Sequence, residues 1–161
     1  MLVLVINSGS SSLKYQLREL ADDGTDAPVP VLASGLVERI GVPGSGVPDH
    51  AAALEQVEAE LAEATGGRTI DAAGHRVVHG GERFTAPARV TNEVIRAIER
   101  LAPLAPLHNP AAAQGLRAMA ERWPDMPQVV VFDTSFHQTM PREAWQYALP
   151  DEVYTCLLYT S

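Results

Sequence analysis

The hydrophobic pattern at the start of the chain predicts a β-hairpin. Residues 2–6 are all apolar and form a run of strand length, as in strands that are buried on both faces. Asn7 follows this run, and residues 8–11 are small turn formers. The next strand alternates, with Leu13, Tyr15 and Leu17 on one face and Ser12, Lys14 and Gln16 on the other. We therefore expect two paired strands joined by a short, serine-rich tip.

The periodicity of the remaining chain predicts helices and strands in alternation. Helices are expected over residues 50–64, 92–101 and 110–123, behind the N-cap residues Asp49, Thr91 and Asn109, with Pro110 as the first helical residue of the third. Strands are expected over residues 31–40, 72–79 and 128–133, the last one buried, and Gly35 is a candidate β-bulge. Polar or Gly/Pro-rich connections, residues 21–30, 41–48 and 82–90, separate these elements.

This order of elements predicts the fold class. Three strands followed by alternating helix and strand indicate an α/β domain with a mixed sheet. A chain of 161 residues is long enough to bury one real core. In open α/β sheets ligands bind beyond the carboxyl ends of the strands, and Asn7, His79 and Asp133 all fall at such ends.

Composition excludes several classes of function. The formal net charge of −8 argues against nucleic-acid binding, which needs a basic face. No apolar run approaches the roughly 18 residues of a membrane helix, and no basic segment precedes the first apolar run as in a signal peptide. The single cysteine cannot form an internal disulfide. We therefore expect a globular protein of the reducing cytoplasm, without nucleic-acid or membrane partners.

The hairpin tip has the chemistry of an anion site. Small residues let the backbone approach an anion closely, and successive amides in a turn form an anion-binding concavity. Lys14 is the only lysine, so the other eleven of the twelve basic side chains are arginines. A compact, flexible ammonium suits a phosphate. The alternative, an ordinary hairpin with a serine-rich turn, stays open on these residues alone.

A second candidate site lies in the strand that contains Arg76. Strand alternation puts Arg76 and Val78 on one face and the two histidines, His75 and His79, on the other. A guanidinium can hold a small carboxylate in a bidentate pair while the valine packs on its apolar end. An arginine in a strand is, however, more often part of a structural ion pair. The two histidines are interpreted as structural.

Four motifs together resemble the acetate/propionate kinase (acetokinase) family. They read N-S-G-S-S-S-L-K from Asn7, H-R-V-V-H-G-G-E-R-F from His75, L-A-P-L-H-N-P from Leu104 and V-F-D-T-S-F-H-Q-T-M-P from Val131. The resemblance implies the RNase H-like fold of the actin, hexokinase and Hsp70 superfamily, here as an incomplete N-terminal domain over residues 1–154. Residues 155–161 do not resemble the family, and we expect them to be an atypical, artefactual tail.

The resemblance also implies the site residues. Asn7 would lie near the metal ion, Ser10, Ser12 and Lys14 would line the phosphate path, and His108 would lie near the transferring phosphoryl group. Arg76 would take the substrate carboxylate, with Val78 and Leu107 against the acyl group. Asp133 would be catalytic. The family assignment for it is acid/base, but a carboxylate substrate is already ionised near pH 7, so we expect Asp133 to organise magnesium or to position other groups. Phe136 and His137 are interpreted as packing residues.

The function implied by the resemblance is reversible phosphoryl transfer from ATP to acetate, giving acetyl phosphate and ADP. It requires ATP and Mg²⁺, for which Mn²⁺ can substitute, and the family implies a homodimer. Propionate kinase is the near alternative, and a non-catalytic domain that binds anions or carboxylates is the alternative from another class. Because both walls of a kinase cleft are needed for phosphoryl transfer, we expect this chain to be inactive alone.

Overall fold

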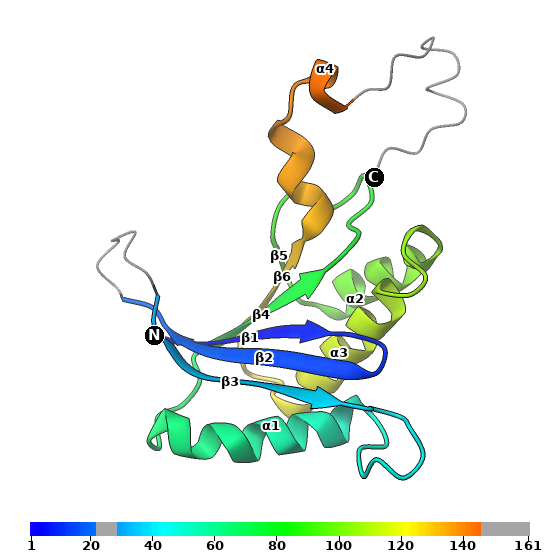
Figure 1. The fold of residues 1–161 in the computed structure, drawn as a ribbon. Coiled ribbons are helices and arrows are strands. Elements are labelled where there is room, and N and C mark those ends of the chain that lie inside the picture. The colour runs from blue at the N-terminus through cyan, green and yellow to red at the C-terminus, as the bar shows by residue number, and fades with distance from the viewer. Residues whose placement is uncertain (22–28, 146–161) are drawn as a thin grey trace.

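The computed structural model describes residues 1–21 and 29–145, and its centre is a mixed six-stranded sheet (Figure 1). In spatial order the strands are β3 (Val31–Glu38), β2 (Ser12–Glu19), β1 (Leu2–Ser8), β4 (Ala72–Val77), β6 (Gln128–Phe132) and β5 (Ala88–Arg89). Strand β2 is antiparallel to both β3 and β1. Strands β1, β4 and β6 run parallel to one another, and β5 is antiparallel to β6. This confirms the predicted mixed sheet. Most of the predicted turn over residues 21–30, and the whole tail over residues 155–161, fall outside the described residues.

Three helices lie on one side of this sheet (Figure 1). They are α1 (His50–Thr65), α2 (Asn92–Arg100) and α3 (Asn109–Arg122). Short helical segments follow α2 and β6, namely η1 (Ala102–Leu104), η2 (Asp133–Thr139) and α4 (Arg142–Trp145). None of the helices in the described ranges is long and apolar enough to cross a membrane.

Two predictions, that β1 is buried on both faces and that β6 is a buried strand, are wrong for one face of the sheet. In β1, Leu4 and Ile6 pack under the helices, but Val5 points to the other face and is 38% exposed. In β6, Val130 is buried while Val129 and Val131 are exposed. We call the side of the sheet that carries Val5, Val129 and Val131 the uncovered face, because no helix of the described residues packs on it.

Two of the three predicted helix caps are confirmed. The Asp49 side chain accepts a hydrogen bond from the Ala52 N–H at 2.9 Å, and Thr91 accepts one from the Val94 N–H at 3.2 Å. Asn109 is not an N-cap. It is the first residue of α3, and His108, in the cap position, makes no side-chain capping bond. The Asn109 side chain turns into the interior instead.

Two further sequence predictions need correction in the sheet. The irregular stretch of residues 82–90 contains β5, a two-residue strand that pairs with β6. Gly35 is not at the bulge, because the register of β2 with β3 shifts between Leu17 and Arg18. Gly35 instead makes room for a ring, since a Cβ there would lie 2.6 Å from the Tyr15 side chain.

Candidate functional site

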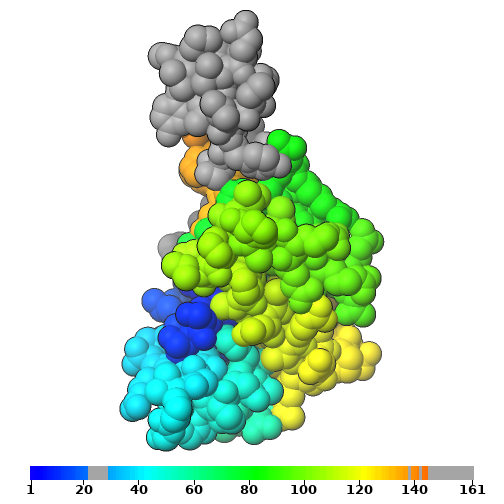
Figure 2. All heavy atoms as spheres, turned by 90° about the vertical axis from the view of Figure 1, so that its right-hand side faces the viewer, coloured from blue at the N-terminus to red at the C-terminus, as the bar shows by residue number. Residues whose placement is uncertain are grey.

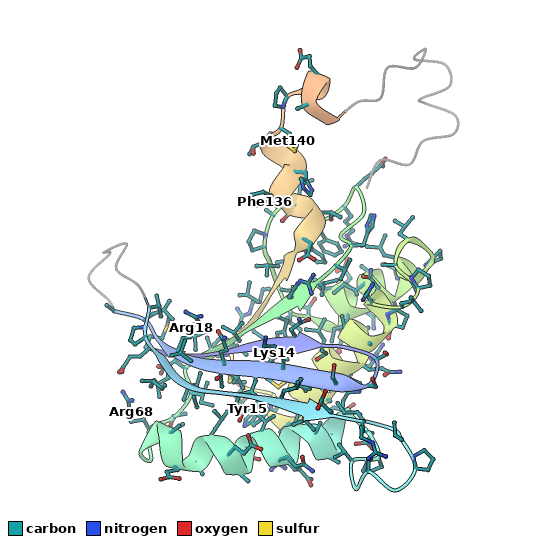
Figure 3. All side chains as sticks on the ribbon, in the orientation of Figure 1. Lys14, Tyr15, Arg18, Arg68, Phe136 and Met140 are labelled. Atoms are coloured by element: carbon teal, nitrogen blue, oxygen red, sulfur yellow. The ribbon has the colours of Figure 1, made fainter. Side chains whose placement is uncertain are left out.

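Polar side chains form a row across the uncovered face where β1 and β4 end. Asn7 of β1 pairs with Lys14 of β2, and both are exposed. The ladder between β1 and β4 runs as far as Ile6 and His75, so Asn7 and Arg76 occupy the next positions along it. Alternation along β2 sends Lys14 to the uncovered face and Tyr15 toward α1 (Figure 3). The sheet therefore aligns an ammonium, an amide and a guanidinium on one side.

Arg76 and Asp133 form a bidentate ion pair at the end of this row. The Arg76 Nε donates to Asp133 Oδ1 at 2.9 Å and to Oδ2 at 3.0 Å, and an Nη donates to Oδ2 at 2.5 Å. These hydrogen bonds raise the pKa of Arg76 above its ordinary value. The side chains stay 48% and 40% exposed, so the pair lies within reach of a ligand from solvent. The parallel register that pairs Arg76 with Val131 brings the two motifs together.

The hairpin tip is held from the helical side. The Gly9 N–H donates to the Ser12 carbonyl at 2.7 Å, which closes the turn. A ring nitrogen of His50 lies 2.9 Å from the Gly9 carbonyl, and His50 is buried at the start of α1. Ser10 stays exposed at the tip. Nothing in the sequence around His50, which directly follows the N-cap of α1, indicates this contact.

Helix α3 also approaches the hairpin closely. A Cβ on Gly115 would overlap the Ser8 hydroxyl, so the helix passes against the last residue of β1. Figure 2 shows the tip of the hairpin (blue) at the surface, between the region of α1 and its preceding loop (cyan) and the segment that joins α2 to α3 (yellow-green). The tip is thus supported on the helical side and open to solvent outward.

The turn after β4 joins three of the sequence motifs. The Asn109 side chain bonds to both backbone polar groups of His79: Oδ1 accepts from the N–H at 3.2 Å, and Nδ2 donates to the carbonyl at 2.9 Å. The Gly80 N–H donates to the Thr134 hydroxyl at 3.0 Å. Leu107, 76% exposed, and His108, also exposed, come directly before Asn109. Val78 is half-buried directly before His79.

The two histidines interpreted as structural are both buried within the fold. A ring nitrogen of His75 lies 3.0 Å from the Gln128 side-chain oxygen, and burial lowers the pKa of His75 to about 4. The Nδ1 of His79 accepts a hydrogen bond from the Gly81 N–H at 2.9 Å. His75 lies on the face covered by the helices, like its ladder partner Ile6.

The segment after β6 projects away from the sheet, as Phe136 and Met140 in Figure 3 show. Phe136 is 83% exposed, and its ring meets the His137 ring edge-on with the centroids 5.8 Å apart. The interpretation of Phe136 and His137 as packing residues is therefore wrong for this structure, because η2 leaves the core directly after Phe132.

Comparison with known proteins gives the family. The family model described as the acetokinase family matches residues 2–159. The chain belongs to the acetokinase family. The acetate kinase of Micrococcus luteus is 88% identical over 154 residues, which cover 96% of this chain and 40% of that protein. The acetate kinase of Thermotoga maritima is 47% identical over 174 aligned residues, covering 96% and 42%.

Solved structures confirm the fold of this acetokinase chain. Porphyromonas gingivalis acetate kinase matches with a TM-score of 0.79 and 40% identity, over 96% of this chain and 42% of that one. A propionate kinase from Francisella tularensis matches with a TM-score of 0.75 and 34% identity, over 95% and 42%. The expected fold, that of the actin, hexokinase and Hsp70 superfamily, is therefore present. The chain spans about two fifths of the length of these relatives.

The residues of this acetokinase chain suit a divalent metal ion that is held mainly by phosphates and water. Within residues 1–21 and 29–145, no group of three or more His, Cys, Asp or Glu side chains could hold a metal. Asn7 and Asp133 offer an amide oxygen and a carboxylate near the ends of β1 and β6. Mg²⁺ commonly keeps several waters and binds through one or two carboxylates together with substrate phosphates. One carboxylate and one amide oxygen are consistent with an ion that is bound in this way.

Proposed function

We propose that this chain supplies one wall of the active site of an acetate kinase, which transfers the γ-phosphoryl group of ATP reversibly to acetate. The row of Asn7, Lys14 and Arg76 on the uncovered face, beside Asp133, carries the proposal. Its two cations suit two substrates, a carboxylate at Arg76 and the phosphates of a nucleotide at Lys14. Membership of a family that includes acetate kinases supports the reaction.

Arg76 binds the acetate carboxylate in this proposal. A guanidinium pairs with a carboxylate through two parallel hydrogen bonds, which orient as well as hold it. Val78 and Leu107 pack on the methyl group, so a longer acyl chain fits less well. An acetate oxygen attacks the γ-phosphorus while the bond to the β-phosphate oxygen breaks and ADP leaves. Acetate is ionised near pH 7 and needs no base, so Asp133 serves another role.

The phosphates lie along the hairpin. Ser10, Ser12 and Lys14, with the amides of the turn, bind phosphate oxygens, and His108 donates a hydrogen bond to the phosphoryl group in transfer. Asn7 and Asp133 would hold Mg²⁺ or Mn²⁺, directly or through water, and the ion would supply positive charge against the phosphates. Asp133 also keeps the Arg76 guanidinium aligned in the absence of ligand, as its two-oxygen contact supports.

The proposal assigns residues 1–154 to this wall and the opposite wall to sequence beyond the two fifths that the chain shares with its relatives. The chain alone then has negligible activity, because charge clamps from both sides stabilise the transition state. We also propose a cytoplasmic homodimer for the whole enzyme. Propionate is the alternative substrate, favoured by the Francisella tularensis relative.

The test is binding of small carboxylates to the labelled 161-residue chain, followed through the Arg76 Nε–H and Val78 methyl signals in NMR spectra. Acetate should shift both signals, and propionate should shift them more weakly. Arg76→Lys should reduce acetate affinity about tenfold or more, because a point charge replaces the bidentate fork.

Arg89→Lys is the matched control. Arg89 is an exposed arginine whose partner in the sheet, Val129, lies on the same uncovered face, and the exchange should leave acetate binding unchanged. An unchanged affinity in Arg76→Lys, or no shift in the original chain, would contradict the substrate assignment. The first result would make Arg76 a structural residue.

A further inference from the structure

Asn109 is a fully buried amide, and a single residue binds both ends of it. Its exposed fraction is 0%. A buried amide without partners is costly, so its hydrogen bonds constrain its position strongly. Here the oxygen accepts from the His79 N–H and the nitrogen donates to the His79 carbonyl. The side chain thus pairs with the backbone of the turn after β4 much as a neighbouring strand would pair with a strand.

The turn that Asn109 binds is fixed from two other directions. Thr134, one residue after Asp133, accepts the Gly80 N–H. Gly80 is packed so tightly that a Cβ there would lie 2.9 Å from the Phe84 carbonyl oxygen. The turn of residues 79–81 is therefore a rigid point to which the start of α3 is tied.

The residues beside these contacts are those of the proposed acyl site. Arg76 and Val78 lie just before His79, whereas Leu107 and His108 lie just before Asn109. The backbone of the second pair is held locally, since the His108 and Asn109 N–H groups both donate to the Ala105 carbonyl, at 3.1 and 2.9 Å. Among the described residues, the side-chain hydrogen bonds that tie the start of α3 to the turn after β4 are those of Asn109.

We propose that Asn109 is a positioning residue that sets Leu107 and His108 against Arg76 and Val78, and so determines how well the site distinguishes acetate from smaller carboxylates. Thr134 assists by fixing the turn. This inference rests on the proposed function and adds a residue to it. Asn109 itself touches no substrate and acts through the two segments that it joins.

The consequence can be measured by comparing acetate with formate. Formate offers the same carboxylate to Arg76 but has no methyl group to meet Leu107 and Val78. One methyl group in contact is worth about 0.8 kcal/mol, or about a fourfold change in affinity. The original chain should therefore bind acetate about fourfold more tightly than formate.

The key variant is Asn109→Ala, in the labelled 161-residue chain, with formate and acetate titrated separately. Formate affinity should stay within about twofold, because Arg76 is intact, while the fourfold preference for acetate should fall to near one. The Leu107 methyl signals should lose their response to acetate. Asn92→Ala is the matched control, since Asn92 is an exposed asparagine at the start of α2, and it should keep the preference.

Thr134 gives a second route if Asn109→Ala does not fold. Thr134→Val removes the acceptor for the Gly80 N–H without changing the shape, and it should lower the acetate preference. Thr134→Ser keeps the hydroxyl acceptor and should keep the acetate preference of the original chain. A full preference for acetate in folded Asn109→Ala, or in Thr134→Val, would overturn the inference. No response to either ligand in the original chain would instead overturn the proposed function and, with it, this inference.

Discussion

At the scale of single residues, the contact between Arg76 and Asp133 has two opposing effects on ligand binding. It aligns the guanidinium, but it also occupies the fork that a substrate carboxylate needs. Both side chains are more than a third exposed. Exposed ion pairs contribute little, roughly 0–1 kcal/mol, so an incoming carboxylate competes with Asp133 on nearly equal terms.

Removing the charge of Asp133 should therefore favour acetate. In Asp133→Asn the Arg76 guanidinium is held less strongly. The acetate affinity of the 161-residue chain should therefore rise about two- to fivefold, which corresponds to the free energy of an exposed ion pair. Isothermal titration without metal measures this directly. Glu93→Gln is the control, because it breaks the exposed pair of Glu93 with Arg83 and leaves Arg76 and Asp133 unchanged. A fall in acetate affinity would show instead that Asp133 contributes to the carboxylate site.

His75 gives a second residue-level effect. Burial lowers its pKa to about 4 from an ordinary 6.5, so the folded protein keeps it neutral while the unfolded chain takes up a proton below about pH 6.5. Its contribution to stability is therefore complete above pH 6.5 and is lost as the pH falls toward 4. The difference between a pKa of 6.5 and one of about 4 corresponds to roughly 3 kcal/mol at low pH.

Urea unfolding at pH 7, 6, 5 and 4 tests this effect. The free energy of unfolding should fall less steeply with pH in His75→Gln than in the original chain, because the variant has no buried imidazole to protonate. His137→Asn, at an exposed position, should keep the original slope. Equal slopes in His75→Gln and the original chain would exclude His75 as the source.

At the scale of elements, the approach of α3 to β1 depends on Gly115. Alanine is normally the better helix former by about 1 kcal/mol, but here a Cβ would overlap the Ser8 hydroxyl. The helix and strand would have to move apart. Since β1 leads into the hairpin tip, the displacement would reach the phosphate end of the proposed site.

Gly115→Ala should destabilise the chain by about 1–3 kcal/mol, as overpacking in cores typically does. Thermal or urea unfolding measures the change. Gln114→Ala, on the exposed side of the same helix, should be neutral or slightly stabilising. Adding Ser8→Gly to Gly115→Ala should recover most of the loss, and a double variant no more stable than Gly115→Ala would contradict the overlap.

Local sequence signals predicted most elements and missed those that tertiary contacts decide. Asp49 and Thr91 cap their helices because capping needs only the next three residues. The same rule failed at Asn109, where the His79 backbone outcompeted the helix end. Strand β5 has two residues and depends on pairing with β6, so residues 82–90 carried no periodicity to reveal it.

At the scale of the molecule, the sequence predicted which residues form the candidate site but not how they meet. The motifs supplied Asn7, Lys14, Arg76 and Asp133 separately. Their arrangement follows from the strand order, which places β4 between β1 and β6. An apolar run such as residues 2–6 also looks the same whether one face or both are covered, so the uncovered face was not foreseen.

The strand order has one more consequence, which concerns length. Lys14 and Arg76 stand on β2 and β4, with β1 between them. Neighbouring strands lie about 4.8 Å apart, so the two cations are anchored about 10 Å apart by the backbone itself. The sheet thus sets the distance between the two charges that a ligand meets, and side-chain rotamers change this distance only slightly. A one-residue slip of β1 would turn Asn7 toward the helices. An insertion within that strand would therefore disrupt the row of polar side chains on the uncovered face.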